Sequence, residues 1–160
     1  MRRVAWWLIF ALTCLGCTGK PPYQGKSVAE LERMLRSPDA DVQVQGAFGL
    51  SLLGSSAREA VPALADGLRS EHALVRQNAA LALGKIGPDA RTAVPALAEA
   101  LGDPEWTVRR QAAIALGELG SDAAGAALAL EKLGKDPDQL VRKAGKEALA
   151  KVRREGAAKK

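Results

Sequence analysis

Apolar and polar residues follow each other along most of this chain with the spacing of α-helices, and the pattern of 61–87 returns at 94–120. In residues 75–86, the apolar or small side chains are Val75, Ala79, Ala82, Leu83 and Ile86. This spacing places them on one face of a helix. The same face returns as Val108, Ala112, Ala115, Leu116 and Leu119, and as Val42, Gly46, Gly49, Leu50 and Leu53.

A shorter apolar stretch precedes each of these helices. In the second unit it consists of Val61, Leu64 and Leu68, and the third unit has the same residue types 33 positions later. Each unit is therefore a pair of helices that cannot bury its apolar face alone, and a fixed period of this length indicates a stack of such units. We predict an all-α fold, an α-solenoid of four stacked helix pairs in the repeat domain 27–154. The units are 27–60, 61–93, 94–126 and 127–154.

Residues with known helix-boundary preferences support these units. Ser27 with Glu30 predicts a capping box at the first helix. Asp103 and Asp136, each before a proline, are predicted to cap the N-termini of second helices. Prolines at 62 and 95 suit the first turn of a first helix. Glycine recurs at the predicted ends of the second helices, where a left-handed conformation is common; these residues are Gly54, Gly87 and Gly120.

The motif VPAL, then a turn with DP, then VRxxAAxALGxxG resembles the short HEAT-like repeats, a type also seen in bilin-lyase-like proteins. The resemblance covers residues 28–152. It is weakest in the fourth unit, where Gly134 and Gly145 depart from the pattern. It implies the same solenoid fold, and it offers an alternative function as a tetrapyrrole lyase or chaperone.

The segment 1–16 has the layout of a secretory signal peptide, with two arginines before an apolar run. That run is too short to span a membrane. Its end, LGC, resembles a bacterial lipobox, which implies acylation of Cys17 and sorting to the outer membrane. Ordinary cleaved secretion and an uncleaved anchor are the alternatives. Residues 17–26 are predicted to be a lipidated tether and 155–160 a basic tail, frayed from Gly156 onward.

The composition offers little for catalysis. The two cysteines of the chain are Cys14 and the predicted acylation site Cys17, so the predicted mature chain has no free thiol for a disulfide or a metal. The one histidine, His72, falls in a predicted turn, where a solvated role is usual. We therefore predict no enzyme activity, no cofactor and no metal. The net charge of +5 includes two arginines of the signal and is too small to indicate nucleic-acid binding.

A binding surface is better supported, because solenoids bind extended partners on the concave face formed by their second helices. Two columns of that face are basic. The columns are Gln43, Arg76, Arg109, Arg142 and Val44, Gln77, Arg110, Lys143. Trp106 stands at a position where the other units have small or polar residues, so it is either an interface anchor or a cover between units. The neighbouring column Phe48, Leu81, Ile114 is predicted to pack between units.

The two basic columns have different alternatives. Arginines of the first column are more readily explained as partners of Asp103 or Asp136 that hold the stack together, whereas the second column is equally open to binding and to structure. The candidate partner-binding residues are Arg76, Gln77, Trp106, Arg109, Arg110, Arg142 and Lys143.

These observations predict a non-enzymatic, monomeric protein-binding or scaffolding module, held by lipid in the bacterial cell envelope. Its predicted partners are unidentified envelope proteins on the concave face. Electrostatic binding of anionic lipid or polysaccharide is a further alternative.

Overall fold

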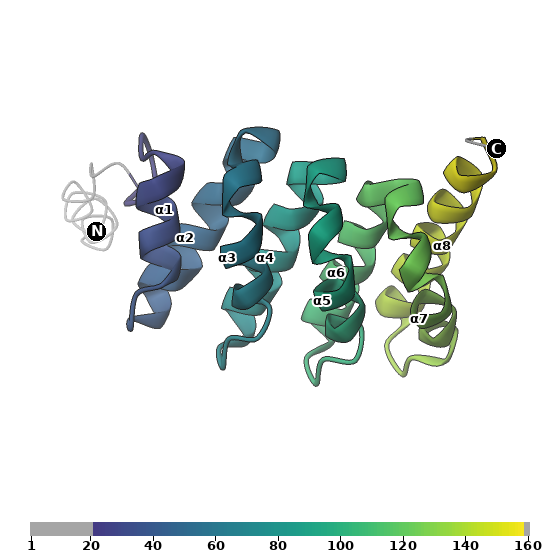
Figure 1. The fold of residues 1–160 in the computed structure, drawn as a ribbon. Coiled ribbons are helices and arrows are strands. Elements are labelled where there is room, and N and C mark those ends of the chain that lie inside the picture. The colour runs from purple at the N-terminus through teal and green to yellow at the C-terminus, as the bar shows by residue number, and fades with distance from the viewer. Residues whose placement is uncertain (1–20, 159–160) are drawn as a thin grey trace, which may run out of the picture.

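The computed structural model describes residues 21–158, and this part of the chain is all helical. Helix pairs stand side by side in one row, from the N-terminal to the C-terminal end (Figure 1). The predicted signal peptide 1–16 and Cys17 lie outside the described residues, as does the start of the tether. The predicted α-solenoid of four helix pairs is confirmed.

Each unit contributes a short first helix and a longer second helix. The first helices are α1 (Val28–Leu35), α3 (Val61–Gly67), α5 (Val94–Ala100) and α7 (Ala127–Lys132). The second helices are α2 (Ala40–Leu53), α4 (Ala73–Ile86), α6 (Trp106–Leu119) and α8 (Gln139–Ala158). In Figure 1 the first helices form the front layer and the second helices the rear layer, with the turns within each pair at the lower edge.

The core lies between these two layers and runs without a break through all four units. Leu64, Leu83, Leu97 and Leu116 are each fully buried. They occupy the predicted apolar columns, so the columns read from the sequence are the core of the fold. Burying a leucine completely contributes about 1.5–3 kcal/mol relative to leaving it exposed.

Small residues let the second helices approach one another closely. A Cβ placed on Gly84 of α4 would lie 3.0 Å from Cα of Ala115 in α6. Gly117 of α6 has the same relation to Ala148 of α8, at 3.1 Å. A larger side chain at either glycine would push neighbouring units apart, so these contacts set the spacing of the rear layer.

Short 3-10 helices, which the repeat pattern does not predict, connect consecutive pairs. They are η1 (Gly54–Ala60), η2 (Gly87–Ala93) and η3 (Gly120–Ala126), and a fourth, η4 (Leu133–Lys135), follows α7. The predicted glycine ends of the second helices are confirmed: Gly54, Gly87 and Gly120 have φ of 53°, 74° and 58°. Their ψ values, between −131° and −142°, differ from the value near +47° of the left-handed helical conformation that was expected, and this combination with positive φ favours glycine.

The prediction that Asp103 and Asp136 cap second helices is wrong. The N-cap of α6 is Glu105, and α8 begins after Asp138, whose Oδ1 accepts hydrogen bonds from the first backbone N–H groups of that helix. Oδ1 of each aspartate instead accepts the backbone N–H two residues later, within the turn between the two helices, and the second helix begins after that turn. The capping box of Ser27 and Glu30 is confirmed.

Both ends of the repeat domain differ from the prediction. Tyr23, predicted to lie in a tether that packs on nothing, is half-buried and packs edge-to-face on Phe48 of α2, with ring centroids 5.2 Å apart. At the other end α8 continues to Ala158, so residues 156–158, which were predicted to be frayed, are helical. Arg153 stands where the other units have a glycine, and a residue with a Cβ favours continuing the helix over the turn into a 3-10 segment.

Within residues 21–158, the segment Trp106–Lys135 is apolar enough for a membrane span by composition alone. Half of its most apolar 18-residue stretch is buried inside the fold. The whole segment comprises α6, η3, α7 and η4 of the stack. Its apolar character is accounted for by the core of units three and four.

Candidate functional site

A row of arginines and aspartates joins neighbouring units along the edge that carries the turns within each helix pair. Arg76, in the first full turn of α4, donates from Nε to Oδ2 of Asp103 at 2.6 Å and from Nη2 to Oδ1 at 2.9 Å. Its Nη1 donates to the backbone carbonyls of Ser70 and Glu71 in its own unit, at 2.8 and 3.0 Å. One guanidinium therefore forms hydrogen bonds both to the turn of its own unit and to the turn of the next unit.

The same arrangement occurs one unit further on. Arg109 binds both carboxylate oxygens of Asp136, at 2.7 and 3.0 Å, and its Nη1 donates to the carbonyls of Asp103 and Pro104. Each aspartate also accepts the backbone N–H two residues later, which shapes its turn. We call these paired residues the arginine–aspartate ladder: Arg76, Asp103, Arg109 and Asp136.

The ladder is shielded from solvent, since only 12–13% of each arginine side chain and 7% of each aspartate side chain are exposed. The hydrogen bond from Arg109 lowers the pKa of Asp136 against a smaller effect of burial. For Asp103 burial is the larger effect and favours the neutral acid, yet hydrogen bonds from Arg76 and the Glu105 N–H still lower its pKa. Both carboxylates are therefore ionised partners in neutral solution.

This geometry supports the structural alternative for the first basic column. Arg76 and Arg109, named as candidate partner-binding residues, use their donors inside the molecule. The side chain of Gln43 takes the equivalent place in the first unit: its Nε2 donates to the Ser37 carbonyl and its Oε1 accepts weakly from Ser70, at 3.4 Å. The first junction thus has a neutral pair where the next two have ion pairs.

Arg142 differs from the other members of its column. Its Nη1 donates to the carbonyls of Asp136 and Pro137, at 2.6 and 2.8 Å, as Arg76 and Arg109 do in their own units. Among residues 21–158 no carboxylate forms an ion pair with it.

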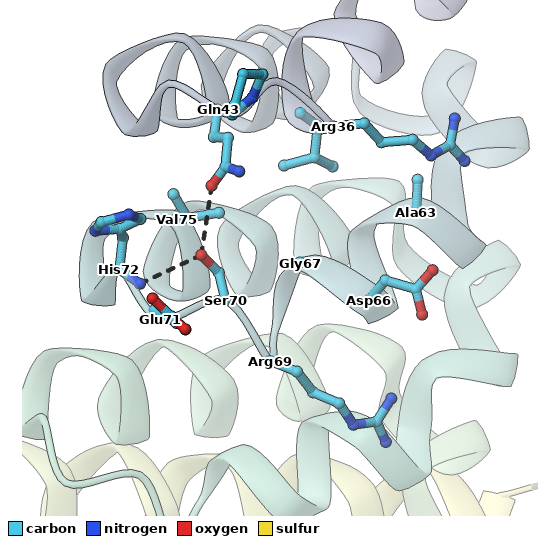
Figure 2. Close-up of a pocket in the computed structure, with 12 residues that line it drawn as sticks. Arg36, Gln43, Ala63, Asp66, Gly67, Arg69, Ser70, Glu71, His72 and Val75 are labelled. Atoms are coloured by element: carbon cyan, nitrogen blue, oxygen red, sulfur yellow. Dashed lines mark hydrogen bonds between the residues drawn. The ribbon is translucent and has the colours of Figure 1, made fainter.

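A groove of about 570 Å³ lies between the first two units, beside the neutral junction. Figure 2 shows the hydroxyl of Ser70 between the side-chain oxygen of Gln43 and the backbone N–H of His72. His72 is exposed and its side chain does not cap α4, as expected for a turn histidine. Within the described chain, no group of three or more His, Cys, Asp or Glu residues is placed to hold a metal ion.

The second basic column lies on the exposed stripe of the second helices, which we call the second-helix face. Arg110 is exposed and lies one turn after Trp106, of which 40% is exposed. Lys143 is also exposed, with Glu147 at the 4.0 Å limit of an ion pair, whereas Gln77 is half-buried.

Two further apolar residues on this face were not singled out from the sequence. Leu74 and Leu140 are 61% and 48% exposed in the first turns of α4 and α8, near the level of Trp106 in α6. The sequence signal was available, because each falls outside the buried columns of its helix. Of the predicted packing column, Ile114 is half-buried against the core.

The comparisons with known proteins agree on the fold. The chain is similar to an engineered protein of known structure, with 29% identity, a TM-score of 0.66 and coverage of 81% of this chain and 63% of that one. A designed armadillo repeat protein in complex with the peptide (KR)4 matches at 20% identity and a TM-score of 0.69, covering 78% and 64%. The complex of CpcE and CpcF of phycocyanin lyase from Nostoc sp. PCC7120 matches at 23% identity and a TM-score of 0.57, covering 82% and 67%.

This chain spans less than two thirds of the length of the first two of these structures, and no curated protein matches the sequence. A protein-family model for HEAT repeats matches residues 28–101 and 88–150. These two segments together include most of the chain and all four helix pairs. The chain therefore belongs to the family of HEAT-repeat proteins.

Proposed function

We propose that this protein is a non-enzymatic binding module that holds a partner protein on its second-helix face. The observation that carries the proposal is the exposed group of Trp106 and Arg110 on α6, which the packing of the solenoid does not require. An aromatic side chain beside an arginine is the typical composition of an energetic centre in a protein interface. The partly exposed leucines at 74 and 140 extend the same surface to the neighbouring helices.

The chemistry of this face favours a partner segment that carries carboxylates beside apolar side chains. Arg110 has no ion pair within residues 21–158, and Lys143 meets only the distant Glu147. An acidic residue of a partner therefore does not need to displace an internal bond of Arg110. Such contacts guide association and fix register more than they add affinity.

Site-specific photo-crosslinking tests this proposal. A photo-crosslinking phenylalanine analogue replaces Trp106 in one variant and the exposed Arg91 of η2 in the control. We expect a discrete protein adduct at 106, its absence at 91, and its loss when Arg110→Glu is combined with the label at 106. Equal adducts at both positions, or an adduct that Arg110→Glu leaves unchanged, would refute a specific face. Adducts to lipid or polysaccharide would favour the electrostatic alternative.

We also propose that the protein is a lipoprotein of the bacterial envelope, attached through Cys17. The sequence of residues 1–17 supports this proposal. Intact-mass measurement and detergent partitioning, in a bacterium with two membranes, test it against Cys17→Ala. We expect a mature species that begins at Cys17 with added acyl mass, and its loss in the variant. An unacylated chain that retains residues 1–16 would refute the proposal.

A further inference from the structure

We propose that Arg142 is a receptor for an aspartate or glutamate carboxylate of a partner protein, at the C-terminal end of the solenoid. Two equivalent arginines, Arg76 and Arg109, already bind a carboxylate within the molecule. In both, Nη1 donates to two backbone carbonyls of the unit's own turn. Nε and Nη2 donate to the two carboxylate oxygens of an aspartate. These internal examples specify the ligand chemistry and its bidentate geometry.

Arg142 has the first half of this arrangement and lacks the second. The carbonyls of Asp136 and Pro137 hold its Nη1 in the same way, so the guanidinium is already oriented. For the two equivalent arginines the aspartate comes from the turn of the following unit, and none of the carboxylates within 21–158 takes that place beside Arg142. A preorganised donor pair loses little conformational freedom on binding, which favours even a single contact.

The end of the stack is not prepared for another repeat of the same kind. Ala80 of α4 and Ala113 of α6 are fully buried, and each of these helices has the second helix of a following unit packed against it. The equivalent residue of α8 is Lys146, which is exposed. Since a lysine there would clash with a closely packed helix, the ligand of Arg142 must approach without burying Lys146.

The charge of this end favours a carboxylate from a partner. Residues 127–160 contain 10 Lys and Arg against 5 Asp and Glu, whereas residues 27–126 contain 9 against 13. A second copy of the chain is a poorer ligand. At the position equivalent to Asp103 and Asp136 its first unit presents Ser37, a hydroxyl that cannot supply a bidentate carboxylate. The proposal concerns a surface apart from the second-helix face, and it shares with the proposed function only the class of partner.

An NMR titration of arginine Nε–H groups tests the proposal on the full, ¹⁵N-labelled chain. The probe is hexaaspartate with blocked termini, and the paired Arg76 and Arg109 serve as internal standards. We expect the Arg142 resonance to move toward the positions of these two. Arg142→Lys keeps the charge but loses the bidentate edge, so we expect it to weaken binding about tenfold. The control Arg154→Lys, at an exposed position of the same helix, should change affinity less than twofold.

Several results would overturn the proposal. One is an equal loss of affinity in Arg142→Lys and Arg154→Lys. Another is an Arg142 resonance that stays in place while the backbone amides around Lys146 shift, which indicates diffuse electrostatic attraction. A shift with inorganic phosphate but not with hexaaspartate assigns a different ligand, and self-association abolished by Arg142→Lys assigns a second copy. If Arg142→Lys fails to fold, the wild-type titration still decides the outcome. Because Arg110→Glu changes the second-helix face and should leave this titration unaltered, the two proposals can fail separately.

Discussion

The ladder pair of Arg109 and Asp136 predicts a measurable coupling between the third and fourth units. The perturbation is a double-mutant cycle with Asp136→Asn, which removes the charge and keeps the shape, and Arg109→Gln, which removes the charge and shortens the side chain. Removing one member of a fully buried ion pair costs about 3–5 kcal/mol, and an exposed pair contributes less than about 1 kcal/mol. With 13% and 7% of the two side chains exposed, this pair lies nearer the buried limit.

We therefore expect each single substitution to cost about 2–3 kcal/mol, with a coupling energy of about 2 kcal/mol because the doubly substituted junction leaves no unpaired charge. The first junction shows that a neutral pair is tolerated, since the side chains of Gln43 and Ser70 meet there. The assay is urea unfolding followed by circular dichroism, with the melting temperature as a second readout. A loss of about 2 kcal/mol should lower it by about 6 °C.

The matched control is the pair of Arg69 and Glu99, which also joins neighbouring units at 2.9 Å but has 61% and 66% of its side chains exposed. Its coupling energy should be below about 0.5 kcal/mol. If the two cycles gave the same coupling, burial would not determine the strength of the ladder, and the reasoning would be refuted.

Two further predictions follow from the ladder and from the close helix contacts. Because the pKa of Asp136 is lowered in the folded state, its contribution is complete above the unfolded pKa of about 3.9 and is lost as pH falls through the folded value; the stability difference between wild type and Asp136→Asn should therefore be constant from pH 7 to 5 and shrink below pH 4, and a difference independent of pH would contradict this. Gly84→Ala should destabilise by about 1 kcal/mol in the same urea assay, because crowding against Ala115 outweighs the gain in helix propensity. Its control Gly156→Ala, where a Cβ meets nothing within 4 Å, should be neutral or stabilising by up to about 1 kcal/mol, and equal effects would argue against crowding.

The repeating core could be predicted from the sequence because it depends on local periodicity. The spacing of Val75, Ala79 and Leu83 fixes which face of α4 is apolar, and these residues are fully or almost fully buried. The ends were harder to predict. Tyr23 looked isolated because its partner Phe48 belongs to α2, beyond the whole of α1 in the sequence, and nothing local indicates that contact.

The ladder was predicted only as an alternative, and its aspartates were also misread as helix caps. An aspartate before a proline fits both roles locally, whereas the ion pair joins residues 27 positions apart. A signal was present, since arginine followed by aspartate at this separation occurs twice in succession. Which arginines remain exposed does not follow from the repeat, because Arg109 and Arg110 are adjacent in sequence, yet Arg109 is shielded in an ion pair and Arg110 is exposed.

The ladder has a consequence for how such a chain can change its length during evolution. The third unit carries Asp103 toward its predecessor and Arg109 toward its successor, so a duplicated segment 94–126 brings both halves of a new junction with it. The first unit, with Ser37 and Gln43, carries neither half. In-frame duplication of the third unit therefore regenerates matched contacts, whereas duplication of the second unit leaves an arginine opposite Ser70 and duplication of the first unit produces a junction without charge. Growth of this solenoid is favoured by duplication of its third unit.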